Sequence, residues 1–161
     1  MRTQTSHPVW LEERTIPVQA KLAALWASLV LVYIYVDILS LYQPGVIDDI
    51  RAGRVWQFDI TQTWAVGALA LMAVPILMVA LSLMLPARAN RLTNLTVATI
   101  YTIVSVTNAI GESWVYYFAF AVGLELIVLG LVLRYAWTWP RTQPRANSDH
   151  RTTADQQLVR H

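Results

Sequence analysis

Apolar residues along the chain fall into four runs separated by short polar stretches. The runs cover residues 22–43, 63–85, 93–111 and 115–137. Each approaches or exceeds the roughly 20 residues that an α-helix needs to cross about 30 Å of hydrocarbon. Helices of a soluble bundle show polar residues at every third or fourth position, but the segment AVGALALMAVPILMVALSLML has no charged face. The pattern predicts an all-α integral membrane four-helix bundle, with four transmembrane helices in antiparallel up-down order.

The stretches between the runs carry turn signals. Pro44 and Gly45 end the first run, because proline disfavours helix in the preceding residue and glycine permits a turn. Within the longest connection, residues 46–62, the segment VIDDIRAG predicts a short amphipathic helix ended by Gly53. Pro75 interrupts the second run. It predicts a kink whose freed carbonyl needs a neighbouring donor or water.

The basic residues predict an orientation. Residues 21–140 form the predicted membrane domain, between a polar lead of residues 1–20 and a tail of residues 141–161 that lacks periodicity and is predicted to be disordered. Of the 12 Lys and Arg residues, only Arg51 and Arg54 lie in the first connection, and the other 10 fall on the side of both termini. By the positive-inside rule, both termini are cytoplasmic.

Composition excludes several classes of function. Hydrophobic residues make up 56% of the chain and charged residues 14%, against roughly 25% charged in soluble domains. The net charge is +2 without a basic stripe, so we expect no nucleic-acid partner. Cysteine is absent and the three histidines lie in the tails, which removes thiol chemistry and intramembrane His ligands. We therefore expect no metal and no cofactor.

Two acidic residues interrupt the runs and define a candidate site. At 1.5 Å per residue, Asp37 lies roughly 9 Å and Glu125 roughly 14 Å from the outer ends of their helices. A carboxylate at such a depth costs about 2.5–3.5 kcal/mol, so it usually faces the bundle interior, a partner or water. On the first and third helices, polar residues recur at every third or fourth position and lie at about the same membrane depth as these two acids. The predicted extracytoplasmic pocket has these ligand- or proton-binding candidates: Asp37, Glu125, Tyr33, Ser40, Tyr101, Ser105, Asn108 and Glu112.

Two functions remain open at this point. The pocket is typical of a small-ligand, proton or ion binding protein of transport type. Alternatively, the protein is a structural or accessory membrane subunit whose polar residues only fix helix packing. An enzyme is less favoured, because neither a nucleophile nor a metal motif accompanies the acids, and we assign no catalytic residue.

One feature of the fourth run bears on the site. Ala119, Gly123 and Gly130 form a small-residue face roughly opposite Glu125. Such a face permits close contact within the bundle or in a dimer. If that face packs inside, Glu125 turns toward lipid or a partner. Besides the lipid bilayer, the sequence thus leaves open a homo-oligomer or a membrane-protein partner.

Four segments resemble a known family: YIYVDILSLYQPGVIDDI, LSLMLPARANRLTN, WVYYFAF and RYAWTWP. They are similar to a bacterial family of small four-span membrane proteins, classed as a domain of unknown function, in which YIYxD is followed by LYxPG. Val36 stands where a glycine is common. The matching residues are Tyr33, Tyr35, Asp37, Leu41, Tyr42, Pro44 and Gly45. The resemblance covers about residues 20–140 and implies a four-helix bundle of the bacterial inner membrane. It implies no activity.

Overall fold

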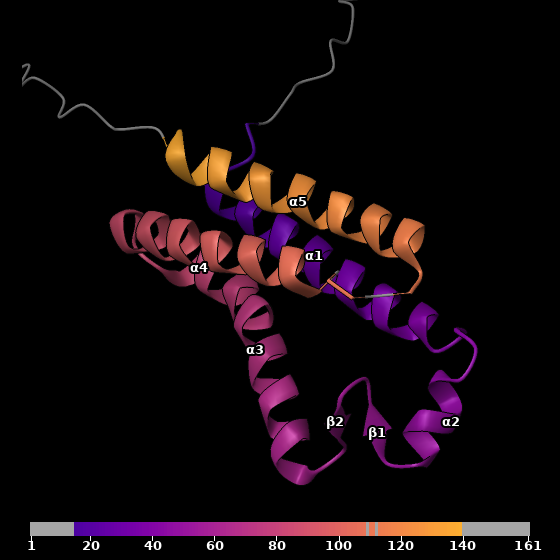
Figure 1. Cartoon of the computed structure of the whole chain (residues 1–161). Coiled ribbons are helices and arrows are strands. Elements are labelled where there is room, and N and C mark those ends of the chain that lie inside the picture. The colour runs from indigo at the N-terminus through magenta and orange to yellow at the C-terminus, as the bar shows by residue number, and fades with distance from the viewer. Residues whose placement is uncertain (1–14, 109, 112, 140–161) are drawn as a thin grey trace, which may run out of the picture.

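The computed structural model describes residues 15–108, 110–111 and 113–139 of the chain. Four long helices dominate it: α1 (Val18–Ser40), α3 (Gln62–Met84), α4 (Ala87–Asn108) and α5 (Val115–Trp137). Between α1 and α3 lie the short helix α2 (Val46–Arg51) and the antiparallel strands β1 (Arg54–Val55) and β2 (Phe58–Asp59) (Figure 1). The all-α class with four antiparallel helices is confirmed. The small hairpin of β1 and β2 was not predicted.

The helices run between two ends of the molecule. We call the end with the start of α1, the α3–α4 connection and the last turn of α5 the terminal end. We call the other end, which carries α2 and the strands, the hairpin end. Helix α1 packs against α3 and α5, and α5 packs against α4. The connection between α3 and α4 has only two residues, Leu85 and Pro86.

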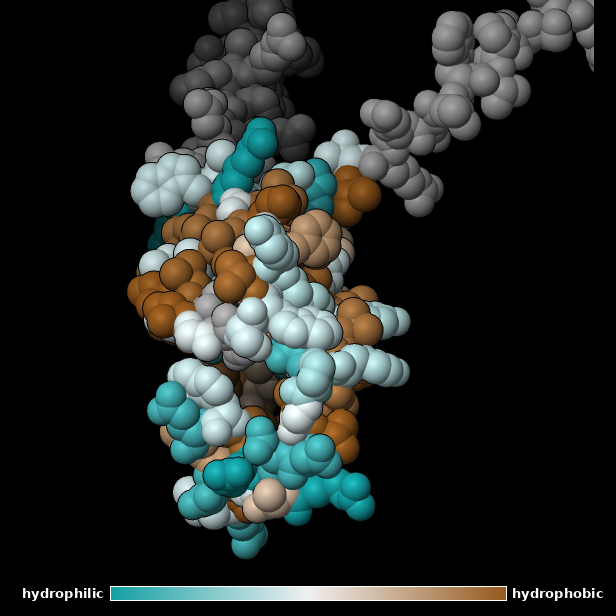
Figure 2. All heavy atoms as spheres, turned by 45° about the vertical axis from the view of Figure 1, so that its right-hand side comes forward, coloured by the Kyte–Doolittle hydropathy of each residue, from teal (hydrophilic) through white to brown (hydrophobic). Residues whose placement is uncertain are grey.

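Three helices are long and apolar enough to cross a membrane: α1, α3 and α5. Each has 23 residues and is therefore about 35 Å long, which exceeds about 30 Å of hydrocarbon. Figure 2 shows apolar side chains over the helices and hydrophilic ones gathered at the lower, hairpin end. The chain is thus a multi-pass membrane protein whose apolar helices contact the lipid bilayer. Helix α4 has 22 residues but is more polar, so a fourth crossing stays a prediction.

The hydrophobic core occupies the terminal half of the bundle. It is built around Trp26, Leu29 and Leu22 of α1, with Met78 of α3 and Leu129 of α5. On α3, the buried residues all lie in the second half of the helix, from Pro75 onward. Figure 1 shows α3 diverging from the other helices toward its start, well away from the end of α1. Helix α3 therefore contributes to the core only through its second half, at the terminal end of the bundle.

Prolines leave two carbonyl groups of α3 without their helical partners. Pro75 has no N–H, so the Leu71 carbonyl loses its usual bond, and the Tyr101 hydroxyl of α4 donates to it instead. Pro86 likewise leaves the Ser82 carbonyl, and Asn90 Nδ2 donates to it at 2.6 Å. The predicted need for a donor near Pro75 is thus met by α4. These two bonds fasten α3 to α4, although the two backbones approach each other at few points.

Turn geometry agrees with the predicted glycine positions. Gly45, at the start of α2, has φ of +88°, and Gly53, just after α2, has φ of +79°. Both values lie in the region that glycine adopts without steric cost. The predicted short helix therefore forms where VIDDIRAG placed it. The tail from residue 141 lies outside the described residues.

Candidate intramembrane binding site

Glu125 lies inside the bundle near the middle of α5. It is 4% exposed, because it belongs to the buried face of α5 together with Ala121, one turn before it, and Leu129, one turn after it. The small-residue face points elsewhere: Gly130 is exposed and Gly123 only half-buried. The structure thus decides the question that the glycines raised. The carboxyl faces inward, and the glycines do not form the core.

Hydroxyl groups from two other helices meet at the level of Glu125. The Tyr33 hydroxyl of α1 and the Ser105 hydroxyl of α4 are hydrogen-bonded at 3.1 Å, and either oxygen can donate. Ser105 also lies beside the Glu125 carboxyl. Tyr33 and Ser105 are both buried. Side chains of α1, α4 and α5 therefore converge at this point, as the 3–4 spacing of the polar residues predicted.

Asp37 lies at the edge of this group. It is one turn beyond Tyr33 toward the hairpin end, and it is exposed. Its charge is close enough to act on Glu125 and on Tyr117. The Tyr117 hydroxyl donates to the Val36 carbonyl at 2.8 Å, which holds the start of α5 against this part of α1. One acid is thus buried and the other is open to the surroundings.

The remaining predicted site residues have different surroundings. Tyr101 is buried, but its hydroxyl is engaged by the Leu71 carbonyl. The Ser40 hydroxyl donates to the Asp37 carbonyl of its own helix at 2.7 Å. Asn108, the last residue of α4, is exposed. Glu112 lies outside the described residues. The structure thus brings together Tyr33, Ser105 and Glu125 with Asp37 beside them, and it does not bring Ser40 or Asn108 to them.

Sequence reasoning missed a second polar group in the terminal half of the bundle. We call it the asparagine cluster, and its members are Trp26, Ser82, Asn90 and Asn94. Trp26 Nε1 donates to Asn94 Oδ1 at 2.6 Å, and Asn94 Nδ2 donates to Asn90 Oδ1 at 2.6 Å. The Ser82 hydroxyl also approaches Asn94 Oδ1, at 3.4 Å. All four side chains are fully buried.

A signal for this cluster was present in the sequence. Asn90, Asn94, Ala98, Tyr101 and Ser105 recur at 3–4 spacing, and all five are buried along one face of α4. The polar stripe of α4 therefore starts at Asn90, about three turns before Tyr101, the first of its residues that was assigned to the pocket. Asn90 lies before the predicted run of residues 93–111, so it was not counted with that stripe.

Comparison with known proteins places the chain in a family. The model of a family of unknown function, DUF6326, matches residues 10–145. Because the match covers most of the chain, the protein belongs to this family, which confirms the resemblance to a domain of unknown function. No curated protein and no solved structure matches the chain. Function must therefore be argued from the site itself.

Proposed function

We propose that the protein binds a proton or another small cation at Glu125, within the membrane, and exchanges it with solution past Asp37. The observation that carries the proposal is the burial of Glu125, whose side chain is 4% exposed. Among the described residues, the one ion pair joins Asp49 of α2 to Arg54 of β1, at the hairpin end. No cationic side chain in this part of the chain is therefore paired with Glu125. Burying an unpaired carboxylate costs several kcal/mol. Such a group is stable when it holds a proton or a bound cation.

The neighbouring hydroxyl groups suit both states of the carboxyl. A hydroxyl can donate to a carboxylate and accept from a carboxylic acid. Ser105 lies beside Glu125 and shares a hydrogen bond with Tyr33. Rotation of these two hydroxyl groups can therefore follow the arrival and departure of a proton without moving a helix.

Asp37 supplies the route for exchange. It is exposed, and it lies one turn beyond the buried Tyr33 on the same face of α1. The exposed Asp37 carboxylate attracts cations, which can then pass to the buried Glu125 carboxyl. One buried carboxyl supplies one charge, which matches a proton or monovalent ion, whereas a divalent ion takes several oxygen ligands.

Charge supports an orientation of the site. Lys21, Arg88, Arg91 and Arg134 lie at the terminal end, whereas the hairpin end carries Asp48, Asp49 and Asp59 besides Arg51 and Arg54. Basic residues favour the cytoplasmic side. We accordingly propose a bacterial cytoplasmic membrane protein with cytoplasmic termini, whose site opens to the extracytoplasmic side.

A second function has specific support. The asparagine cluster and the bond from Tyr101 to the Leu71 carbonyl keep polar groups paired inside the protein. Hydrogen bonds of this kind hold helices together and need no ligand. A structural or accessory subunit would use Tyr33, Ser105 and Glu125 in the same way, with no exchange of protons or ions.

The experiment measures proton uptake by the full-length protein in detergent, with a pH-sensitive dye in the solution, after a drop in pH near neutrality. The wild type should take up protons that Glu125→Gln does not take up, because an amide does not accept a proton, and Asp37→Asn should slow the uptake. Asp59→Asn, an exposed carboxylate of β2, is the matched control and should behave as the wild type.

The infrared spectrum distinguishes the two functions. A protonated Glu125 contributes a carboxylic-acid C=O band that shifts with pH and disappears in Glu125→Gln. If Glu125→Gln retains full proton uptake and changes only thermal stability, the binding function is wrong and the structural one is favoured.

A further inference from the structure

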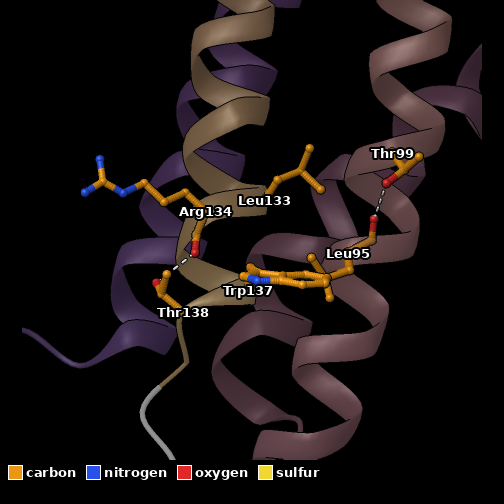
Figure 3. Close-up of a pocket in the computed structure, with 6 residues that line it drawn as sticks. All are labelled: Leu95, Thr99, Leu133, Arg134, Trp137 and Thr138. Carbon is orange, nitrogen blue, oxygen red and sulfur yellow. Dashed lines mark hydrogen bonds between the residues drawn. The ribbon is translucent and has the colours of Figure 1, made fainter.

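A groove runs between α4 and α5 at the terminal end, on the outside of the bundle. Its volume is about 540 Å³. Figure 3 shows Leu133 and Trp137 of α5 facing Leu95 of α4 across it, while the Arg134 side chain points away. Its two threonine hydroxyls are already used, because Thr99 donates to the Leu95 carbonyl and Thr138 to the Arg134 carbonyl. The walls therefore offer mainly apolar surface.

Arg91 stands at the mouth of this groove. It is one turn before Leu95 and two turns before Thr99, so the three residues share one face of α4. Its guanidinium carbon lies 5.7 Å from the centre of the Trp137 ring, which is itself part of the groove wall. No described residue accepts a hydrogen bond from Arg91 Nε. A guanidinium without an acidic partner among the described residues thus caps an apolar groove.

We propose that this groove holds one acyl chain of an anionic phospholipid, with its phosphate paired to Arg91. The lining excludes a fully polar ligand and the cation at the mouth favours a negative group, so the complementary molecule is an amphiphile with an anionic head. Guanidinium donors match phosphate oxygens in geometry and charge. Tryptophan is enriched at the level of lipid headgroups, which is where the last turn of α5 places Trp137.

Depth and surroundings agree with this occupant. Arg91 and Thr99 are eight residues apart, so the groove extends about 12 Å along α4, within the thickness of one leaflet. Arg88 lies one turn before Arg91, and Lys21 Nζ lies 5.2 Å from the centre of the Tyr135 ring at the same end. These cations add a general attraction for an acidic leaflet, and only Arg91 joins the groove through Trp137.

The test is native mass spectrometry of the full-length protein in detergent, titrated with phosphatidylglycerol or phosphatidylcholine of equal chain length. The wild type should retain more phosphatidylglycerol than phosphatidylcholine. Arg91→Gln should lower phosphatidylglycerol retention about fivefold, the value for one basic residue near an anionic lipid. Arg91→Lys should restore part of it. Arg88→Gln, which removes an exposed cation one turn away, is the matched control and should retain clearly more phosphatidylglycerol than Arg91→Gln does.

The acyl chain has a test of its own. Leu133→Trp fills the groove while Arg91 keeps its charge, so it should also lower phosphatidylglycerol retention. Circular dichroism shows whether each variant is folded before lipid is added. Equal loss in Arg88→Gln and Arg91→Gln, equal retention of the two lipids, or full retention by Leu133→Trp would overturn the proposal. Displacement of the lipid by inorganic phosphate, or a dimer that Leu133→Trp dissociates, would overturn it as well.

Discussion

At the scale of single residues, the most informative contact is the one between Tyr101 and the Leu71 carbonyl. A proline inside a membrane helix leaves a carbonyl that lipid cannot satisfy. Helix α4 provides the missing donor from its own polar stripe. Pro75 is therefore tolerated in α3 because the Tyr101 hydroxyl of α4 bonds to the carbonyl that it frees. The effects of substituting Pro75 and Tyr101 on the free energy of unfolding should not be additive.

Tyr101→Phe should lower the free energy of unfolding by about 1 kcal/mol, because it leaves the Leu71 carbonyl unpaired. In a Pro75→Ala background the same change should cost less, since the backbone N–H that alanine restores can bond to that carbonyl. Thermal unfolding in detergent measures both. Tyr116→Phe is the control, because Tyr116 is 93% exposed. Additive effects of the two substitutions would show that the hydroxyl and the proline are independent.

The sequence predicted these residues unequally. Helical spacing placed Tyr33 and Ser105 with the acids, but it left open whether Glu125 faces the bundle or lipid, and the structure shows that Glu125 is buried. The partner of Tyr101 could not be predicted, because it depends on how closely α4 approaches α3. Ser40 was predicted for the pocket on spacing alone, yet its hydroxyl turns back to the Asp37 carbonyl. Serine near a helix end commonly bonds to its own backbone.

At the scale of helices, α4 differs from the other three because its buried face is polar. That face bonds to α1 through Trp26 and Asn94, and to α3 through Asn90 and the Ser82 carbonyl. Apolar packing between helices gains little in lipid, so hydrogen bonds and close packing decide which helices associate. The asparagine cluster therefore fixes the position of α4, and with it the depth at which Ser105 meets Glu125.

Asn94→Ala should destabilise the protein by about 2 kcal/mol, because Trp26 Nε1 loses its acceptor and the Asn90 side chain loses its donor inside the bundle. Thermal unfolding in detergent is the measurement. Thr96→Ala is the matched control on the same helix, since Thr96 is exposed. Equal melting temperatures for the two variants would contradict the role assigned to the cluster.

At the scale of the whole molecule, the open question is how many times the chain crosses the membrane. Helices α1, α3 and α5 have the length and composition of membrane spans. Four crossings put both termini on one side, whereas a peripheral α4 would leave the start of α5 on the same side as the end of α3. The proposed site needs the first arrangement, because Ser105 must reach the depth of Glu125.

Cysteine labelling can decide this, because the natural sequence contains no cysteine. With a membrane-impermeant maleimide on intact cells, Asn108→Cys should react and Arg88→Cys should react only after permeabilisation. Ile100→Cys, near the middle of α4, should be protected in both conditions. Arg54→Cys, beyond the end of α1, serves as the external reference. Reaction of Arg88→Cys and Asn108→Cys from one side would exclude a fourth crossing.

The two-residue connection between α3 and α4 has a consequence for how the protein is made. Two residues reach at most about 7 Å, so α4 begins at the depth where α3 ends. The insertion machinery therefore receives the two helices as one unit as the ribosome extends the chain. In the predicted arrangement with four crossings, the apolar α3 favours entry of the more polar α4, and the Leu71 and Ser82 carbonyls of α3 are paired as soon as α4 arrives. Lengthening the connection between α3 and α4 would delay the arrival of α4 after the insertion of α3.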